Sequence, residues 1–453
     1  MESTAENAAT QHSLRPMHGK HSYQRLLHNQ YLIHNLIVLV GTVTAGLLNY
    51  ILNPVLTHLI GLASYSQVVS LLGLLAIILT PTQVIGTIVV RATSTLAANG
   101  DAPKIKDLFL RLTRILLPVG VLSAIIFASF SNAITSFLHL KSTVDVFIVS
   151  VALVLAFIGP IAGGTIQGSQ RFIWFSFSAI ATPLFRLVLV GIMIYLGFGL
   201  EGALIGIVLA AAVVYFATLI PLRHLLSGRR EDSGSLRPLV SYSVTASVAL
   251  VSTVLLLNTD TVLAGHFFHA RTAGIYDGLA VIGRLVLYFS ASVSAVMFPR
   301  IAALHDRGEH ATTVAFQALL GVFALSLMAE IVFVVAAPLI VTVLFHTSAV
   351  LVVSNQLAWY GLAMLMFALA QALITYFLSV NDRLFVVSAL AAWVLQAALI
   401  VERHDSIAEF VQAMVIANGV LLLGLGIQFA VFVRREARSG HMAAPPIEPV
   451  ATG

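Results

Sequence analysis

Long apolar stretches recur along the whole chain, and they constrain its fold more than any other feature. Hydrophobic residues make up 59% of the 453 residues, whereas charged residues make up only 9%. Soluble proteins carry about 25% charged residues, and one soluble core could not bury this much apolar sequence. A helix that crosses a bilayer needs about 20 mainly apolar residues. The sequence therefore predicts an all-α polytopic membrane protein.

Twelve segments meet this length requirement. They lie near residues 33–55, 66–90, 109–131, 144–165, 172–197, 202–222, 238–264, 273–298, 315–344, 349–378, 383–401 and 408–433. A polar stretch rich in charge, Ser and Gly divides them six and six. We therefore expect a cytosolic N-terminal tail, two six-helix lobes joined by a cytosolic linker, and a cytosolic C-terminal tail. Their ranges are 1–32, 33–222, 223–237, 238–433 and 434–453 in chain order.

The positions of Lys and Arg support this division and give it a direction. If the N-terminus lies in the cytosol, nineteen of the 24 basic residues fall on the inner side. Only Lys141, Arg271 and Arg403 fall on the outer side, and Arg186 and Arg284 lie within predicted spans. Basic residues concentrate in cytosolic loops, so we expect both termini in the cytosol. The polar start of the chain does not resemble a secretory signal peptide.

The two halves resemble each other weakly at a constant spacing. Tyr65 follows the first span as Tyr276 follows the seventh, and Arg91 closes the second span as Arg300 closes the eighth. Internal repeats are common in secondary transporters. Because each half has an even number of spans, both halves share one orientation, and their pseudo-twofold axis is expected to run along the membrane normal.

Two arginines within the spans are the first candidate functional residues. Arg186 and Arg284 each lie near the middle of a span, where an Arg costs about 2.5–3.5 kcal/mol on insertion scales. Their guanidinium groups could bind an anionic substrate group in a central cavity, because the Arg donor fork matches phosphate oxygens. The alternatives are a structural ion pair, for which Glu330 in the ninth span is the candidate partner, or snorkelling toward water.

Polar residues in three further places are weaker candidates. Asp260 lies near the outer end of the seventh span and could bind Na⁺ or carry a proton, or it could pair with Arg271 or His266. Asn49 and Asn53 lie four residues apart, on one face of a helix. They could line the cavity or form a helix–helix hydrogen bond, and Gln83 in the second span has the same two interpretations.

Several classes of function lack their residues in this chain. Cysteine is absent, and the 15 His residues show no metal-ligand spacing, so we expect no metal site and no cofactor. No GxxxxGK[ST] motif occurs that would indicate ATP hydrolysis. The loops are too short, and too poor in acidic residues and His, for a membrane glycosyltransferase or acyltransferase. A net charge of +5 reflects the loops and does not indicate nucleic-acid binding.

Short motifs give the chain a family resemblance. They are NTDTVLAG at 258–265, AGIY at 273–276, MFPRIA at 297–302, GGTIQGSQRF at 163–172 and GFGLEGA at 197–203. The first three resemble the seventh and eighth spans of bacterial polysaccharide exporters, and the last two resemble the turns that flank the fifth span there. These exporters are Wzx-type lipid-linked oligosaccharide flippases of the multidrug/oligosaccharidyl-lipid/polysaccharide (MOP) superfamily. The resemblance covers about residues 33–433.

The resemblance implies a V of two six-helix lobes around a cavity lined by the first, second, seventh and eighth spans. It places Arg284, Asp260, Asn49, Asn53 and Gln83 near that cavity, with Arg186 as a further candidate. It implies that an undecaprenyl-diphosphate-linked oligosaccharide is flipped from the cytosolic to the periplasmic leaflet of the bacterial inner membrane, for surface polysaccharide biosynthesis. No bond is made or broken, so no enzyme activity is expected. A polysaccharide polymerase and chain-length machinery are the partners to expect.

The resemblance also implies that Na⁺ or H⁺ could drive transport. Some relatives use an acidic residue on the seventh span together with polar groups from the eleventh and twelfth spans. Asp260 matches the acidic residue, while the last two spans offer Gln396, Gln412 and Asn418 but no carboxylate. The chain departs from the pattern there.

A multidrug/cation antiporter of the same superfamily is the main alternative. A cavity for cationic drugs needs acidic residues, whereas the middle of the spans holds two Arg and one Glu. A lipid II flippase is a narrower variant that the sequence does not distinguish from other glycolipid flippases. An integral-membrane glycosyltransferase or acyltransferase, and a membrane scaffold without transport, are further alternatives.

Overall fold

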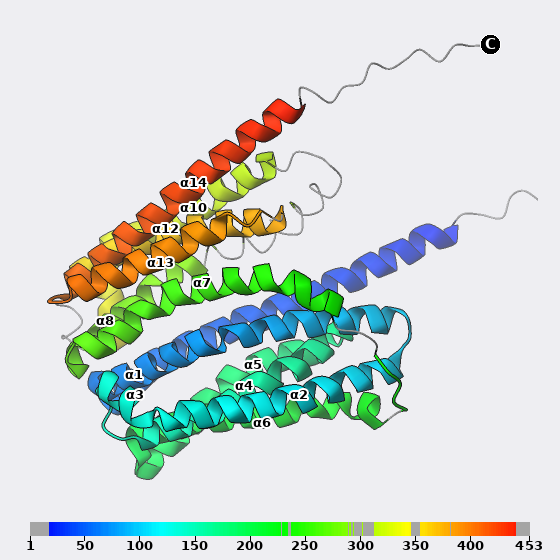
Figure 1. Cartoon of the computed structure of the whole chain (residues 1–453), viewed down its shortest axis with the longest axis horizontal. Coiled ribbons are helices and arrows are strands. Elements are labelled where there is room, and N and C mark those ends of the chain that lie inside the picture. The colour runs from blue at the N-terminus through cyan, green and yellow to red at the C-terminus, as the bar shows by residue number, and fades with distance from the viewer. Residues whose placement is uncertain are drawn as a thin grey trace, which may run out of the picture.

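The regular elements of the described chain are all helices (Figure 1). The structure, a computed structural model, describes residues 18–227, 229–233, 237–288, 290, 293, 301, 312–345, 354–380 and 382–440. The helices of the first half are α1 His18–Ala98, α2 Ala102–Ser129, α3 Ser131–Phe137, α4 Val144–Gly168, α5 Phe172–Met193, the π-helical turn η1 Ile194–Phe198, and α6 Gly199–Ser227. Those of the second half are α7 Arg237–Phe267, α8 Ala270–Gly283, α10 Thr312–Phe345, α12 Ser354–Ser379, α13 Phe385–Glu402 and α14 Ile407–Gly440.

Glycines break the longest helical runs where the sequence predicts the ends of spans. Gly61 interrupts α1 with φ 75°, between the predicted first and second spans. Gly197 and Gly199, with φ 91° and 51°, separate α5 from α6. Glycine adopts positive φ without the steric cost that a Cβ brings. In Figure 1 the chain reverses at this bend, so that both arms of α1 extend from it toward the same side of the molecule.

Nine helical runs in the described part of the chain are long and apolar enough to cross a membrane. Two of them measure 59 and 54 residues, about twice the length of one crossing. The prediction of an all-α multi-pass membrane protein is therefore confirmed. The predicted eighth span is described only through residue 288 and at isolated positions beyond it, and the predicted hinge at 346–349 lies outside the described residues. Helix α1 begins at His18, well before the predicted first span.

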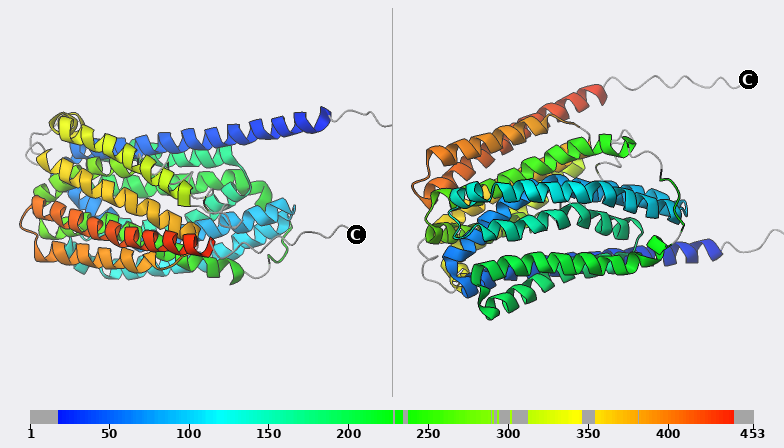
Figure 2. Two further views of the ribbon diagram at one scale, coloured as in Figure 1. Left: turned by 90° about the horizontal axis from the view of Figure 1, so that it is seen from above. Right: turned by 60° about the horizontal axis from the view of Figure 1, so that its bottom comes forward.

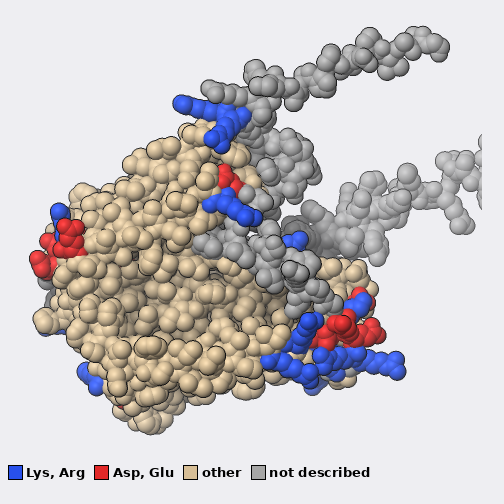
Figure 3. Space-filling model, in the orientation of Figure 1, with Lys and Arg blue, Asp and Glu red and all other residues tan. Residues whose placement is uncertain are grey.

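The surface agrees with a membrane location. On the face shown in Figure 3, charged side chains lie at the two ends of the molecule, and the body between them is almost free of charge. Large apolar side chains such as Leu122, Ile125 and Val335 are exposed on the helices of this body. Water would disfavour so much exposed apolar surface, so this band is suited to lipid.

The two halves meet through close helix contacts. Helices α7 and α8 lie against α1, and Figures 1 and 2 show the remaining helices of each half on opposite sides of this junction. A Cβ added at Gly274 would overlap the Leu62 carbonyl oxygen, and one at Gly265 would overlap the Ser70 hydroxyl. The Ser70 hydroxyl donates to the Thr261 carbonyl at 3.2 Å. Away from this junction α14 diverges from the first half (Figure 1).

Candidate functional site

A buried ion pair joins α7 to the end of α8. Arg284 Nη2 lies 3.0 Å from Asp260 Oδ1 and 3.3 Å from Asp260 Oδ2. The same nitrogen donates to the Leu257 carbonyl oxygen, one turn earlier on α7. The Asp260 side chain is 0% exposed and that of Arg284 is 15% exposed. A charge this deeply buried needs a partner of opposite sign, and each of these residues supplies it for the other.

Two tyrosines complete the surroundings of Asp260. Tyr276 of α8 donates its hydroxyl to Asp260 Oδ2 at 2.8 Å, and Tyr360 of α12 donates to the same oxygen at 3.1 Å. Both tyrosines are fully buried, and their rings pack edge to face. A Cβ at Gly283 would overlap the Tyr360 ring, so glycine is required for this close approach. Helices α7, α8 and α12 therefore converge on one carboxylate.

Neighbouring polar contacts fix α7 in position. Trp393 of α13 donates its indole N–H to the Thr259 hydroxyl at 2.9 Å, and the Gln396 amide donates to the Leu256 carbonyl at 3.2 Å. Asn418 of α14 donates to the Ala363 carbonyl on α12 at 3.2 Å. The remaining amide oxygens of Gln396 and Asn418 are buried without a partner among the described residues. Of the polar residues that the sequence offers on the last two spans, Gln396 and Asn418 are thus buried inside the second half, whereas Gln412 is exposed.

Arg284 and Asp260 pair with each other and not with the partners considered from the sequence. Arg284 pairs with Asp260 and not with Glu330, whose carboxylate lies against Gly361 of α12. Asp260 pairs with Arg284 and not with Arg271 or His266. The His266 ring instead bonds the Phe137 carbonyl at 2.7 Å. The Asp260–Arg284 pair was not among the alternatives drawn from the sequence, because a partner 24 residues away across the α7–α8 turn cannot be identified from residue order alone.

The first half contains a second polar cluster, in which the contact of the arginine is longer than in the Asp260–Arg284 pair. Arg186 Nη1 of α5 lies 3.4 Å from Asn49 Oδ1 on α1. Asn53, one turn further along α1, accepts a hydrogen bond from the buried Tyr65 hydroxyl at 3.1 Å. No carboxylate lies within 4 Å of the Arg186 guanidinium among the described residues, and its Nε is buried without a partner there. Within the described part of the chain, Arg186 is therefore a cation without a counter-charge.

The predicted candidates thus fall into two groups with different electrostatics. Arg186, Asn49 and Asn53 come together in the first half, and Arg284 and Asp260 come together in the second. Gln83 is exposed on the second arm of α1. Glu330 on α10 is half-buried, and its Oε2 has no hydrogen-bond partner in the described part of the chain.

Sequence reasoning missed three residues around the ion pair. Tyr276 served only as a marker of the internal repeat, and Tyr360 carried no signal, because a Tyr in an apolar span is common. Asp277 was also missed. It is fully buried on α8 beside Ser66 of α1, where the two halves meet. The available signal was a carboxylate directly after Tyr276 within an otherwise apolar stretch.

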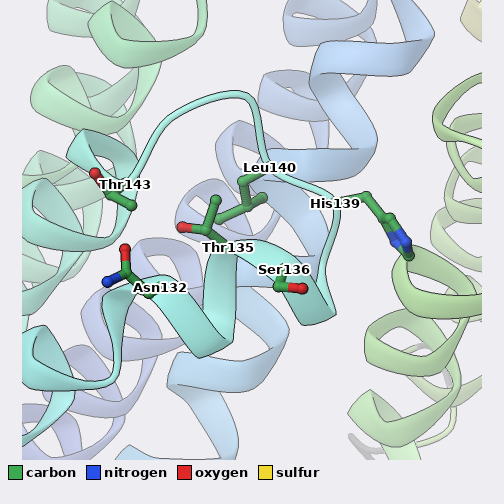
Figure 4. A pocket seen from close by; sticks show the side chains of 6 residues that line it. All are labelled: Asn132, Thr135, Ser136, His139, Leu140 and Thr143. Atoms are coloured by element: carbon green, nitrogen blue, oxygen red, sulfur yellow. The ribbon is translucent and has the colours of Figure 1, made fainter.

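A separate pocket lies at the end of α3, and it holds none of the predicted residues. Its volume is about 520 Å³, and Figure 4 shows the polar side chains of Asn132, Thr135 and Thr143 at its edge. The His139 ring points away from it toward the neighbouring helix (Figure 4). No group of His, Asp and Glu in the described residues could hold a metal ion.

Comparisons with known proteins identify the family and the fold. The sequence profile of the polysaccharide biosynthesis protein family matches residues 32–305. No curated protein sequence matches the chain. A multidrug resistance MATE family transporter of the MOP superfamily, in an inward-facing conformation, has a similar structure. Its TM-score is 0.69 at 14% identity, over 85% of this chain and 95% of that one.

Two further solved structures share the fold. The lipid II flippase MurJ, in an inward closed conformation, matches with a TM-score of 0.63 at 13% identity, over 88% of this chain and 87% of its own. The eukaryotic MATE transporter AtDTX14 matches at 0.65 and 14%, over 92% and 98%. The chain therefore shares the fold of these MATE and MurJ transporters, and because the family profile spans more than half of the sequence, it belongs to the polysaccharide biosynthesis protein family.

Proposed function

We propose that the chain flips an undecaprenyl-diphosphate-linked oligosaccharide from the cytosolic to the periplasmic leaflet, for exopolysaccharide, capsule or O-antigen biosynthesis. Membership in the polysaccharide biosynthesis protein family supports the pathway, and the MOP fold supports transport as the activity. The proposal includes twelve membrane helices in two lobes, 33–222 and 238–433, joined by the linker 223–237 and related by a pseudo-twofold axis. The tails 1–32 and 434–453 and the linker lie in the cytosol.

The observation that carries the proposal is the unneutralised Arg186. A guanidinium among apolar helices is costly unless an anion compensates it. Within the described residues, Arg186 donates one long hydrogen bond, to the amide oxygen of the neutral Asn49. A diphosphate supplies the missing charge and presents oxygens that an Arg fork binds in a bidentate manner. Asn49 and Asn53 then offer amide groups to the phosphate or to the first sugar.

The second half contributes in another way. Arg284 is occupied by Asp260 in this conformation, so a substrate can bind it only by displacing the carboxylate. We propose that Arg284 and Gln83 contact the cargo later in the cycle, when the two lobes rock about their junction. A hydrated cationic cavity lowers the barrier for the diphosphate, while the prenyl tail stays in lipid through a gap between the lobes.

The proposed orientation places the protein in the bacterial inner membrane with both termini in the cytosol. The end of the molecule with most Lys and Arg, at the right of Figure 3, then faces the cytosol. A polysaccharide polymerase and chain-length machinery would take up the product on the periplasmic side.

Gene deletion with complementation tests this function. The deletion strain is expected to accumulate a diphosphate-linked saccharide on the cytosolic leaflet, and the wild-type gene is expected to clear it. Arg186→Ala should fail to clear it, whereas Arg403→Ala, a substitution of an exposed outer-loop arginine, should succeed. Full clearance by Arg186→Ala, at equal protein levels in the membrane, would contradict the assigned role of Arg186.

A multidrug/cation antiporter remains the second candidate, favoured by one observation. Asp277 is fully buried without a salt bridge among the described residues, and buried acidic groups are what a cationic drug would need. Efflux of a cationic dye from cells distinguishes the two functions. If the chain is a flippase, the wild type should export no cationic dye, and Asp277→Asn should leave dye export unchanged.

A further inference from the structure

The carboxylate of Asp260 is fully occupied by groups of the protein itself. Oδ1 accepts from Arg284, and Oδ2 accepts from Tyr276 and Tyr360 as well as from Arg284. An ionised carboxylate has about four acceptor positions, and four donor contacts are present here. The side chain is 0% exposed, so no solvent-facing oxygen remains for another ligand.

The positive charge nearest to Asp260 is covalently part of the chain. A dissolved cation that bound the same oxygens would have to lie beside the Arg284 guanidinium, where two like charges repel each other. The guanidinium is also covalently attached to the chain, so its effective concentration at Asp260 is higher than that of a dissolved ion. The protein charge therefore outcompetes a dissolved ion for this position.

We propose that Arg284 is a built-in counter-cation that replaces a bound alkali-metal ion at Asp260. The wild-type chain then binds no Na⁺ there, and the cation site exists only in latent form. Its ligands would be the Asp260 carboxylate and the Tyr276 and Tyr360 hydroxyl oxygens. The inference rests on the geometry of the ion pair and deepens the proposed transport role of this site, but it does not depend on which cargo is carried.

One neighbouring feature supports a latent cation site. The Gln396 amide oxygen of α13 is buried without a partner among the described residues, while its nitrogen is held by the Leu256 carbonyl, one turn before Asp260. An amide oxygen is a suitable ligand for a hard cation. Removing the guanidinium would leave a buried carboxylate uncompensated, which gives the site a strong demand for a small cation.

Direct Na⁺ binding to the purified full-length chain tests this proposal. Radioactive Na⁺ binding is measured in detergent, with choline keeping the ionic strength constant. We expect no saturable binding by the wild type or by Arg284→Lys, which keeps the charge. Arg284→Ala and Arg284→Gln should bind about one ion per chain in this single-site scheme, and adding Asp260→Asn should abolish that binding.

The wild-type arm keeps the test decisive even if the variants fold poorly. Saturable Na⁺ binding by the wild type that Asp260→Asn removes would overturn the proposal, as would folded Arg284→Ala and Arg284→Gln proteins that bind no Na⁺. Absence of binding to the wild type, together with a Na⁺-dependent rise in the unfolding temperature of Arg284→Gln, supports it. Neither result depends on lipid translocation. The proposed function can therefore fail while this inference stands, and this inference can fail while the proposed function stands.

Discussion

Two arginines in apolar helices occupy opposite electrostatic situations. Arg284 has a buried carboxylate at 3.0 Å, while Arg186 has a neutral amide at 3.4 Å. Their positions were evident from the sequence, because charges are rare in apolar spans. Their partners were not, because pairing depends on how α7, α8 and α12 pack. Arg284 takes the ion-pair alternative of the two that the sequence left open, whereas Arg186 has no counter-charge among the described residues.

Breaking the Asp260–Arg284 pair from the carboxylate side should be strongly destabilising. Asp260→Asn leaves a buried guanidinium unpaired, which costs about 3–5 kcal/mol, whereas Tyr360→Phe removes one hydrogen bond and costs about 1–3 kcal/mol. Denaturant unfolding in mixed micelles measures both values. Asp405→Asn, at an exposed carboxylate, is the matched control and should change stability little. Equal stability of Asp260→Asn and the control would show that the pair is absent in the membrane protein.

At the scale of helices, glycine decides both where the chain bends and how closely its halves approach. Gly61, Gly197 and Gly199 adopt positive φ at turns between spans. Gly274 and Gly265 let α8 and α7 approach α1 without a Cβ between them. The long apolar helices of the described residues were predicted from hydropathy alone. The helical start at His18 was not, because a polar segment carries no apolar signal that would indicate a helix.

The tight junction of α8 with α1 gives a prediction about glycine. Gly274→Ala should lower the free energy of unfolding and weaken the contact between the halves, because its Cβ would overlap the Leu62 carbonyl oxygen. Gly426→Ala is the matched control, because no atom lies within 4 Å of its added Cβ. The control should be neutral or stabilising by up to about 1 kcal/mol, since alanine favours helix. Equal stabilities of the two variants would argue against the close contact.

For the whole molecule, the distribution of basic residues predicts which end faces the cytosol. The chain contains no cysteine, so single substitutions give unambiguous labels. Lys141→Cys should react with a membrane-impermeant maleimide in cells with a permeable outer membrane, because its loop is expected to be periplasmic. Asn99→Cys, in the loop between α1 and α2, should react only after the inner membrane is opened. The reverse pattern would invert the proposed orientation.

Features of the whole molecule that depend on local composition along the chain could be predicted from the sequence. Features that depend on packing between distant helices could not. Hydropathy and the family motifs were sufficient to predict a helical membrane protein with a fold like that of the MATE and MurJ transporters. The site could be predicted only as a set of unusual residues. Asp277 and Tyr360 were missed, because their importance comes from burial against other helices and not from their place in the sequence.

Translocation of a labelled undecaprenyl-diphosphate sugar across proteoliposomes tests the central claim most directly. Wild-type protein should move the lipid between leaflets. Arg186→Ala should reduce the rate by about tenfold or more, because loss of a charge-assisted hydrogen bond to phosphate is worth about 1.5–3 kcal/mol. Arg186→Lys should retain part of the activity, and Arg403→Ala should retain all of it. No transport by the wild type, or equal rates for Arg186→Ala and the wild type, would contradict the account.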